Sequence, residues 1–437
     1  MFHTLLAKKY IHIIAPLFLG SVVAYLDRVN VAFAALTMNA DMGFTPEVYG
    51  MGAGILFFGY MVFGLPGSLI ASKWSPSKWI AFILVAWGCV LCLMPFMQSA
   101  WQFYVYRFLL GACEASFFPV VYAVIMPPWF NQKERPAAMS LFLSSMLISA
   151  IIGAPVAGVL LDLTFFGLHG WQTLFLLEAI PAILLGIYFF FCLPDTPRQA
   201  SWLTEEEKDQ LTAEYLNETE TKNAAQKFTV WQALKDTKVL TLCGIFFLWM
   251  IGFWGFNFWM PTALKEVTGW SNSQVGLLIT IPMVITFIVF NFWGAHSSRT
   301  GDKKWHMVLP LFLGAVAMGL SPFVHDAYMT LVLITLSAIG LYVGLGVWWS
   351  YPTTFLSGAA AAAGTSLINS IGCTSGWVGP YFIGVLNSLT GSFHYAYLGM
   401  ALCIALAACW LLYIGRTNKK QPREVVKQVQ SLQEEHV

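Results

Sequence analysis

The sequence predicts an all-α membrane protein in which twelve transmembrane helices form two pseudo-symmetric halves of six. Three observations predict this fold class: 58% of the 437 residues are hydrophobic while 10% are charged, the mean hydropathy is +0.67, and six apolar stretches lie on either side of one hydrophilic segment. Soluble domains usually carry about 25% charged residues, so a water-soluble enzyme is disfavoured. The net charge of +1 creates no global field that would favour nucleic acid, and the lipid bilayer is the expected environment.

The predicted helices are the stretches of about 20 apolar residues that can cross a bilayer. Those of the first half lie near residues 11–36, 48–71, 79–98, 101–127, 137–161 and 172–193. Those of the second half lie near residues 239–264, 274–296, 305–324, 327–350, 362–388 and 395–415. The predicted units are therefore an N-terminal half (1–193), a linker (194–238), a C-terminal half (239–415) and a tail (416–437).

Basic residues concentrate on one side of the predicted bundle, and this bias sets the orientation in the membrane. That side holds both ends of the chain, the linker and the loops that contain Lys73, Lys133 and Arg299, whereas the loops of the other side hold Lys265 alone. We therefore expect both termini and the linker to be cytoplasmic.

The two halves repeat a loop pattern at a constant offset. Residues 43–50 (GFTPEVYG) return as residues 269–276 (GWSNSQVG), and residues 72–73 (SK) return as residues 298–299 (SR). A parallel duplication of this kind predicts a substrate site between the halves, near the middle of the membrane.

The linker contains one predicted helix. Thr204 and Glu207 have the spacing of a capping box, which opens a short amphipathic helix. A solvated tether between the halves is the simpler interpretation of this segment, and a part in gating is the alternative.

Four charged residues fall deep inside predicted helices of the first half, where lipid makes charge costly and function is the default explanation. Asp27 and Arg28 are neighbours in the first span, while Arg107 and Glu114 are seven residues apart in the fourth. Seven residues are nearly two helical turns, so Arg107 and Glu114 share a face, whereas Asp27 and Arg28 diverge by about 100° and can meet different partners.

This set of residues suits a proton site next to an anion site. A carboxyl in an apolar cavity gains proton affinity and a nearby Arg opposes that gain, so an anion that binds the Arg would couple protonation to binding. The planar donor fork of Arg28 suits a carboxylate. The alternative is a buried ion-pair network that only holds helices together, and four charges inside the membrane favour the functional interpretation.

Other buried groups are aromatic or amide side chains, which can line a binding cavity. Packing or an interfacial position is the favoured explanation for Trp254 and Trp259, and a structural role is favoured for Glu178. A binding role is favoured for Trp349 and Asn369, which lie deeper among small residues.

Several other chemistries lack their sequence patterns. There is no GxxxxGK[ST] loop, so ATP-driven pumping is not expected, and no group of His, Cys and carboxylates has metal-ligand spacing. The eight cysteines lie in apolar stretches, and packing is favoured even for the Cys89-x-x-Cys92 pair. We expect no metal and no cofactor.

Two of these spans resemble the major facilitator superfamily and, more narrowly, its anion:cation symporter family. Residues 25–32 (YLDRVNVA) resemble the opening signature of that family, and residues 107–119 (RFLLGACEASFFP) resemble its most characteristic block. Residues 195–208 and 363–372 are similar to those of members that import tartrate-like, sugar-acid or hydroxyphenylacetate-like carboxylates. The resemblance covers nearly the whole chain.

The resemblance implies a role for each candidate residue. Asp27 and Glu114 would handle protons, Arg107 would balance and organise these acids, and Arg28 would meet the substrate carboxylate. The positions that match the cavity lining of the family are Tyr60, Trp349 and Asn369.

Two positions depart from the family pattern. The loop between the second and third spans usually reads Gly-x-x-x-Asp-Arg, and here Ser72 takes the Asp position, followed by Lys73, so any charge latch in this loop is weaker or built differently. Cys373 stands where relatives often have Asn, which removes a hydrogen-bonding group beside the cavity.

These observations together predict a monomeric proton-coupled symporter that imports a small organic carboxylate across the bacterial inner membrane by alternating access, and not an enzyme. A monoanion that enters an inside-negative cell pays about 2.3 kcal/mol per 100 mV, so at least one co-transported cation is needed to avoid this penalty. Protons are the expected coupling ion. An organic-anion exchanger and a ligand sensor that does not transport stay open as alternatives, and tartrate-like, sugar and aromatic acids all stay open as substrates.

Overall fold

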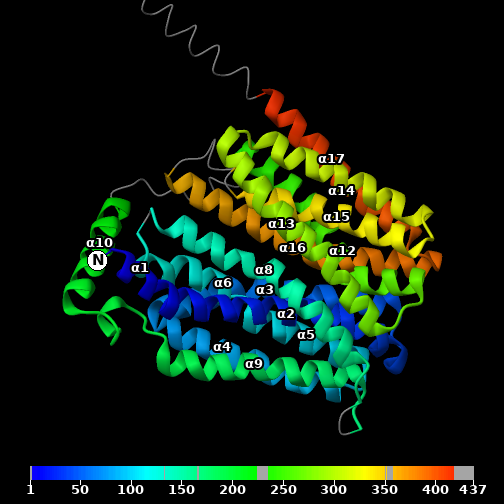
Figure 1. The fold of residues 1–437 in the computed structure, drawn as a ribbon, viewed down its shortest axis with the longest axis horizontal. Coiled ribbons are helices and arrows are strands. Elements are labelled where there is room, and N and C mark those ends of the chain that lie inside the picture. The colour runs from blue at the N-terminus through cyan, green and yellow to red at the C-terminus, as the bar shows by residue number, and fades with distance from the viewer. Residues whose placement is uncertain are drawn as a thin grey trace, which may run out of the picture.

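Long helices packed side by side make up the computed structural model, which describes residues 2–131, 133–164, 167–223, 235–349, 351 and 358–417 (Figure 1). The helices of the first half are α1 (Phe2–Lys9), α2 (Ala15–Met42), α3 (Pro46–Lys73), α4 (Pro76–Leu93), α5 (Ala100–Glu114), α6 (Phe117–Val120), α7 (Met126–Trp129), α8 (Arg135–Leu161) and α9 (Gly170–Cys192). The helices that follow are α10 (Glu205–Asn223) in the linker and then α12 (Thr237–Thr268), α13 (Asn272–Thr300), α14 (Lys304–Leu320), α15 (Ala327–Trp348), α16 (Gly358–Thr390) and α17 (His394–Thr417).

The predicted fold class is confirmed. Among the described residues, eleven helical segments are long and apolar enough to cross a bilayer, and the twelfth predicted span, near residues 362–388, falls within α16. Residues 224–234 of the predicted linker and residues 418–437 of the predicted tail lie outside the described residues.

The repeat in the sequence corresponds to the same local structure in both halves. Gly43 ends α2 and Gly269 ends α12, each with φ = +65°, a left-handed conformation that side chains with a Cβ rarely adopt. The next helix is capped in both cases by a hydroxyl that accepts a backbone hydrogen bond, from Thr45 before α3 and from Ser271 before α13. Hence both loops make the same reversal between two antiparallel spans.

The halves meet along two equivalent helix pairs, α3 with α16 and α8 with α13. Glycines allow the backbones to approach: a Cβ on Gly50 would lie 2.4 Å from the carbonyl oxygen of Pro380, and a Cβ on Gly276 would lie 2.3 Å from that of Ala154. Both glycines lie one to two turns from the repeated loops. The closest approach of the halves is therefore near the end of the bundle that carries these loops, which we call the loop end.

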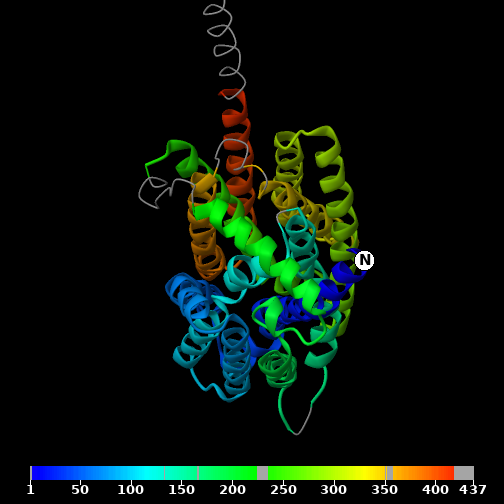
Figure 2. The ribbon, with the colours of Figure 1, turned by 90° about the vertical axis from the view of Figure 1, so that its left-hand side faces the viewer.

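The opposite end, which we call the linker end, carries α1 and α10 (Figure 2). The predicted capping box is confirmed, because the Thr204 backbone N–H donates to Glu207 and the Glu207 N–H donates to the Thr204 hydroxyl. The linker helix is held on the first half by two ion pairs, Lys8 with Glu207 at 2.8 Å and Arg135 with Glu218 at 3.0 Å. These contacts favour a docked tether over a free one.

Candidate functional site

The four charged residues predicted inside the first half are all buried. Asp27, Arg107 and Glu114 have no exposed surface, and Arg28 is 5% exposed. Because an isolated charge in an apolar interior is costly, the arrangement of their partners decides what the site can do.

Arg28, Tyr60 and Glu114 form a hydrogen-bonded chain across three helices, which we call the Arg28 cluster. The Arg28 guanidinium on α2 donates to the Tyr60 hydroxyl on α3, and that hydroxyl donates to Oε2 of Glu114 on α5 at 2.7 Å. The same carboxylate oxygen lies 3.5 Å from Nη2 of Arg28. The positive charge that the sequence assigns to an anion is thus balanced by Glu114 in this structure.

Arg107 donates its hydrogen bonds to backbone carbonyl oxygens and not to a carboxylate. Its Nε donates to the carbonyl oxygen of Gly52 at 3.3 Å, and its Nη2 donates to the carbonyl oxygens of Ala53 at 3.3 Å and Arg28 at 3.4 Å. Its Nη1 is buried without a hydrogen bond. Arg107 therefore anchors α5 to α2 and α3 and supplies a positive charge close to the acids.

Asp27 has neighbours of its own beside the Arg28 cluster, and it also interacts electrostatically with Glu114. Asn30 and Trp87 flank its carboxyl, yet neither carboxyl oxygen has a hydrogen-bond partner, and Nδ2 of Asn30 and Nε1 of Trp87 have none either. As expected for adjacent helical residues, Asp27 and Arg28 meet different neighbours. No cation or donor lies at bonding distance from this buried carboxyl, so it needs bound water, or a proton that it takes up during transport.

Aromatic rings surround the Arg28 guanidinium. The ring centroids of Tyr60, Tyr25, Phe118 and Trp254 lie 4.8, 5.0, 5.4 and 5.8 Å from its central carbon, which is the range of cation–π contacts. Trp254 belongs to α12 in the second half, so the Arg28 cluster lies at the interface between the halves. The sequence favoured a packing role for Trp254, and its contact with Arg28 makes it part of the candidate site.

The two other second-half candidates, Trp349 and Asn369, are not among the described side chains whose rings lie over the Arg28 guanidinium. Trp349 is half-buried and packs edge-on against Phe246 at 5.3 Å. Asn369 is exposed on α16, one turn before Cys373, which is close enough to Arg28 to interact with it electrostatically. Thus α16 reaches the cluster through Cys373, the position where the sequence departs from the family.

The described residues contain no group of three or more His, Cys, Asp or Glu side chains that could hold a metal ion.

Polar contacts between the halves close the loop end. Asp162, just beyond α8, accepts hydrogen bonds from Nδ2 of Asn272 at 2.9 Å and from the backbone N–H of Ser273 at 3.0 Å. Lys265 on α12 donates to the carbonyl oxygen of Leu36 at 3.3 Å. The Tyr49 hydroxyl donates to the carbonyl oxygen of Phe258 on α12 at 2.7 Å. Partial burial raises the pKa of Asp162, but hydrogen bonds from Ser273 outweigh this effect and hold the pKa below its ordinary value. The contact between Asp162 and α13 is therefore strongest when Asp162 is ionised.

Comparison with known proteins identifies the family. The model of the Major Facilitator Superfamily matches residues 17–380. A putative tartrate transporter of Agrobacterium vitis is 38% identical over 399 residues, 91% of this chain and 88% of that protein. The putative metabolite transport protein NicT of Pseudomonas putida is 38% identical over 394 residues, 89% of each chain. The inward-open structure of the xylose transporter XylE from E. coli matches with a TM-score of 0.72 at 15% identity over 92% of this chain and 95% of that chain. These relatives are transporters and not enzymes, and the chain belongs to the major facilitator superfamily.

Proposed function

We propose that the chain is a proton-coupled symporter that imports a small organic carboxylate across the bacterial inner membrane by alternating access. The observation that carries this proposal is the Arg28–Tyr60–Glu114 chain at the interface of the halves. It offers a planar cation to an anion and couples that cation to a group that can take up a proton.

Charge balance links the proton to the substrate. With both acids ionised, Asp27, Arg28, Arg107 and Glu114 sum to zero. A carboxylate that binds Arg28 adds one negative charge to a buried site, and an uncompensated buried charge is costly. A proton on Glu114 restores neutrality and also frees Arg28 from its present partner, so binding and protonation favour each other.

The chemistry of the Arg28 guanidinium and the similarity to a known transporter both support an organic carboxylate as substrate. Two parallel N–H donors of a guanidinium match the two oxygens of a carboxylate, and the rings of Tyr25, Phe118 and Trp254 around Arg28 hold its fork in place. The relative from Agrobacterium vitis named a putative tartrate transporter supports an organic acid.

Alternating access is supported by the one-sided closure of the bundle. Among the described residues, the hydrogen bonds that join the halves lie on the loop-end side, for example those of Asp162 and Lys265. With the termini in the cytoplasm, as the basic residues predict, this state is closed to the outside. Parting of α8 from α13 and of α3 from α16 would expose the Arg28 cluster to the outside.

The proposal is tested by internal pH in dye-loaded proteoliposomes after tartrates, sugar acids and aromatic acids are added outside as pools. We expect acidification by wild-type protein and none beyond passive leak in empty liposomes or with Glu114→Gln. Absence of acidification by wild-type protein that still exchanges preloaded anions would replace symport by anion exchange.

A further inference from the structure

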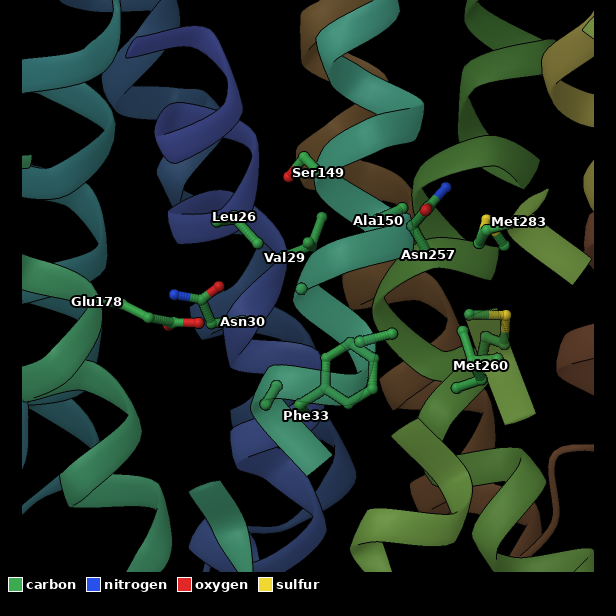
Figure 3. A pocket seen from close by; sticks show the side chains of 14 residues that line it. Leu26, Val29, Asn30, Phe33, Ser149, Ala150, Glu178, Asn257, Met260 and Met283 are labelled. Carbon is green, nitrogen blue, oxygen red and sulfur yellow. The ribbon is translucent and has the colours of Figure 1, made fainter. Parts of the chain in front are cut away.

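A second polar site lies between the halves, on the loop-end side of the Arg28 cluster. It is a cavity of about 30 Å³ bounded by α2, α8, α9, α12 and α13, a size that holds about two water molecules. Most of its lining is apolar, and the polar side chains in it are Asn30, Ser149, Glu178 and Asn257 (Figure 3).

Glu178 is the carboxyl of this cavity. It is 8% exposed, and its Oε2 atom is buried without a hydrogen bond. Figure 3 shows Glu178 of α9 and Asn30 of α2 pointing toward one another. Nδ2 of Asn30 and Oγ of Ser149 are likewise buried without a partner. Unsatisfied polar atoms around an open volume are a place for ordered water, which can carry protons between them.

Asn30 connects the cavity to Asp27, which does not itself line it. Asn30 is three residues after Asp27 on α2, so both lie on one face of the helix, and Asn30 flanks the Asp27 carboxyl. Asp27 and Glu178 are close enough to interact electrostatically.

The other helices around Glu178 add no charge. Ser149 on α8 and Asn257 on α12 line the cavity, and α4 places Gly88 against Ala179 on the helix of Glu178. Asp27 is therefore the titratable group that faces Glu178 in the described part of the chain.

The contact that closes the loop end also bounds the cavity. Ala154 of α8 and Ile279 of α13 line it, and Gly276 meets the carbonyl of Ala154 so closely that a Cβ would lie 2.3 Å from that oxygen. Parting of α8 from α13 would open the cavity toward the loop end. While the helices touch, an ionised Glu178 would be a buried charge whose Oε2 atom has no hydrogen bond, which is costly.

We propose that Glu178 is the carboxyl through which protons from the outside enter the transporter and pass to Asp27. In the outward-open state a proton from external water binds the Glu178 carboxylate. The O–H bond of Glu178 then breaks as the proton moves through cavity water to the carboxylate of Asp27, and Glu178 is left ionised until it is reloaded. This inference rests on the proposed proton symport and assigns Glu178, which the sequence left as structural, to the proton route.

The test compares wild-type protein, Glu178→Gln and Glu178→Asp in two assays on the same proteoliposomes. The first is internal acidification after the carboxylate pool is added at neutral and at acidic external pH. The second is counterflow of the same acids at equal pH on both sides, which needs no net proton transfer. Glu266→Gln is the matched control, because Glu266 is an exposed residue of α12 near the same end and does not line the cavity.

We expect Glu178→Gln to slow acidification at neutral external pH about tenfold or more, with recovery in acid and with unchanged counterflow. Glu178→Asp should recover part of the rate, and Glu266→Gln should match wild type. Equal loss of acidification and counterflow in Glu178→Gln, without recovery in Glu178→Asp, would assign Glu178 a structural role and overturn the inference. Wild-type rates and pH dependence in Glu178→Gln would also overturn it. Absence of acidification by wild-type protein would instead contradict the proposed symport, and this inference with it.

Discussion

The Arg28 guanidinium and the Glu114 carboxylate lie 3.5 Å apart between the helices of the first half, with the Tyr60 hydroxyl bonded to both. This triangle joins the group best suited to an anion to the group best suited to a proton. A substrate carboxylate can bind Arg28 only by replacing Glu114 as its counter-ion.

Glu114→Gln should abolish proton-driven accumulation and leave counterflow exchange intact. The amide can still accept from Tyr60, so the geometry is retained, but it cannot exchange a proton. Uptake of labelled substrate under an imposed pH gradient, beside counterflow at equal pH, measures the two activities. Loss of both would assign Glu114 to folding or binding.

Arg28→Lys should weaken substrate binding while the protein remains folded. An ammonium keeps the charge but loses the two-pronged fork, and charge-assisted hydrogen bonds are worth about 1.5–3 kcal/mol, roughly a 10- to 100-fold rise in Kd. Arg135→Lys is the matched control, because Arg135 binds Glu218 at the linker end. Unchanged affinity in Arg28→Lys would remove Arg28 from the substrate site.

Gly276→Val should shift the population toward the state that is open at the loop end. The added side chain would enter the space of the Ala154 carbonyl, and overpacking of this kind costs about 1–3 kcal/mol. The readout is the reaction of a membrane-impermeant maleimide with a cysteine introduced at Ala157, which lines the cavity beside Glu178. Gly294→Val is the control on the same helix, because a Cβ there meets nothing within 4 Å; equal labelling of both variants would refute the role of this contact.

Closure of the loop end should not depend on pH in the neutral range and should weaken in strong acid, where Asp162 becomes protonated. Its pKa is lowered in the closed state, so its contribution is fully present above the ordinary pKa of about 3.9 and is lost as the pH falls below that value. Distances between spin labels at Leu163 and Val267 should lengthen in Asp162→Asn at neutral pH. A wild-type distance in that variant would show that closure of the loop end does not depend on the charge of Asp162.

The sequence predicted most of the fold because each span needs only a local apolar stretch. The repeat of the loops that contain Gly43 and Gly269 was likewise visible in the sequence, since each loop depends on its own residues. The buried charges were identified one helix at a time, and the face shared by Arg107 and Glu114 followed from helix geometry alone.

Contacts between helices could not be predicted in the same way. Trp254 and Glu178 were assigned to packing and structure because an isolated span gives no sign of what it faces. Only the crossing of α12 over α2 brings Trp254 to Arg28, and only the cavity between the halves shows Glu178 unpaired. Conversely, Trp349 packs on Phe246 and is not among the described rings that lie over Arg28.

The most direct test of the account is the number of protons taken up when the purified protein binds a carboxylate substrate. Titration calorimetry in two buffers of different ionisation enthalpy gives this number for wild-type protein and for Glu114→Gln. We expect uptake of about one proton per monocarboxylate by wild-type protein, because the site must stay neutral, and none by Glu114→Gln. Binding without proton uptake by wild-type protein would contradict it.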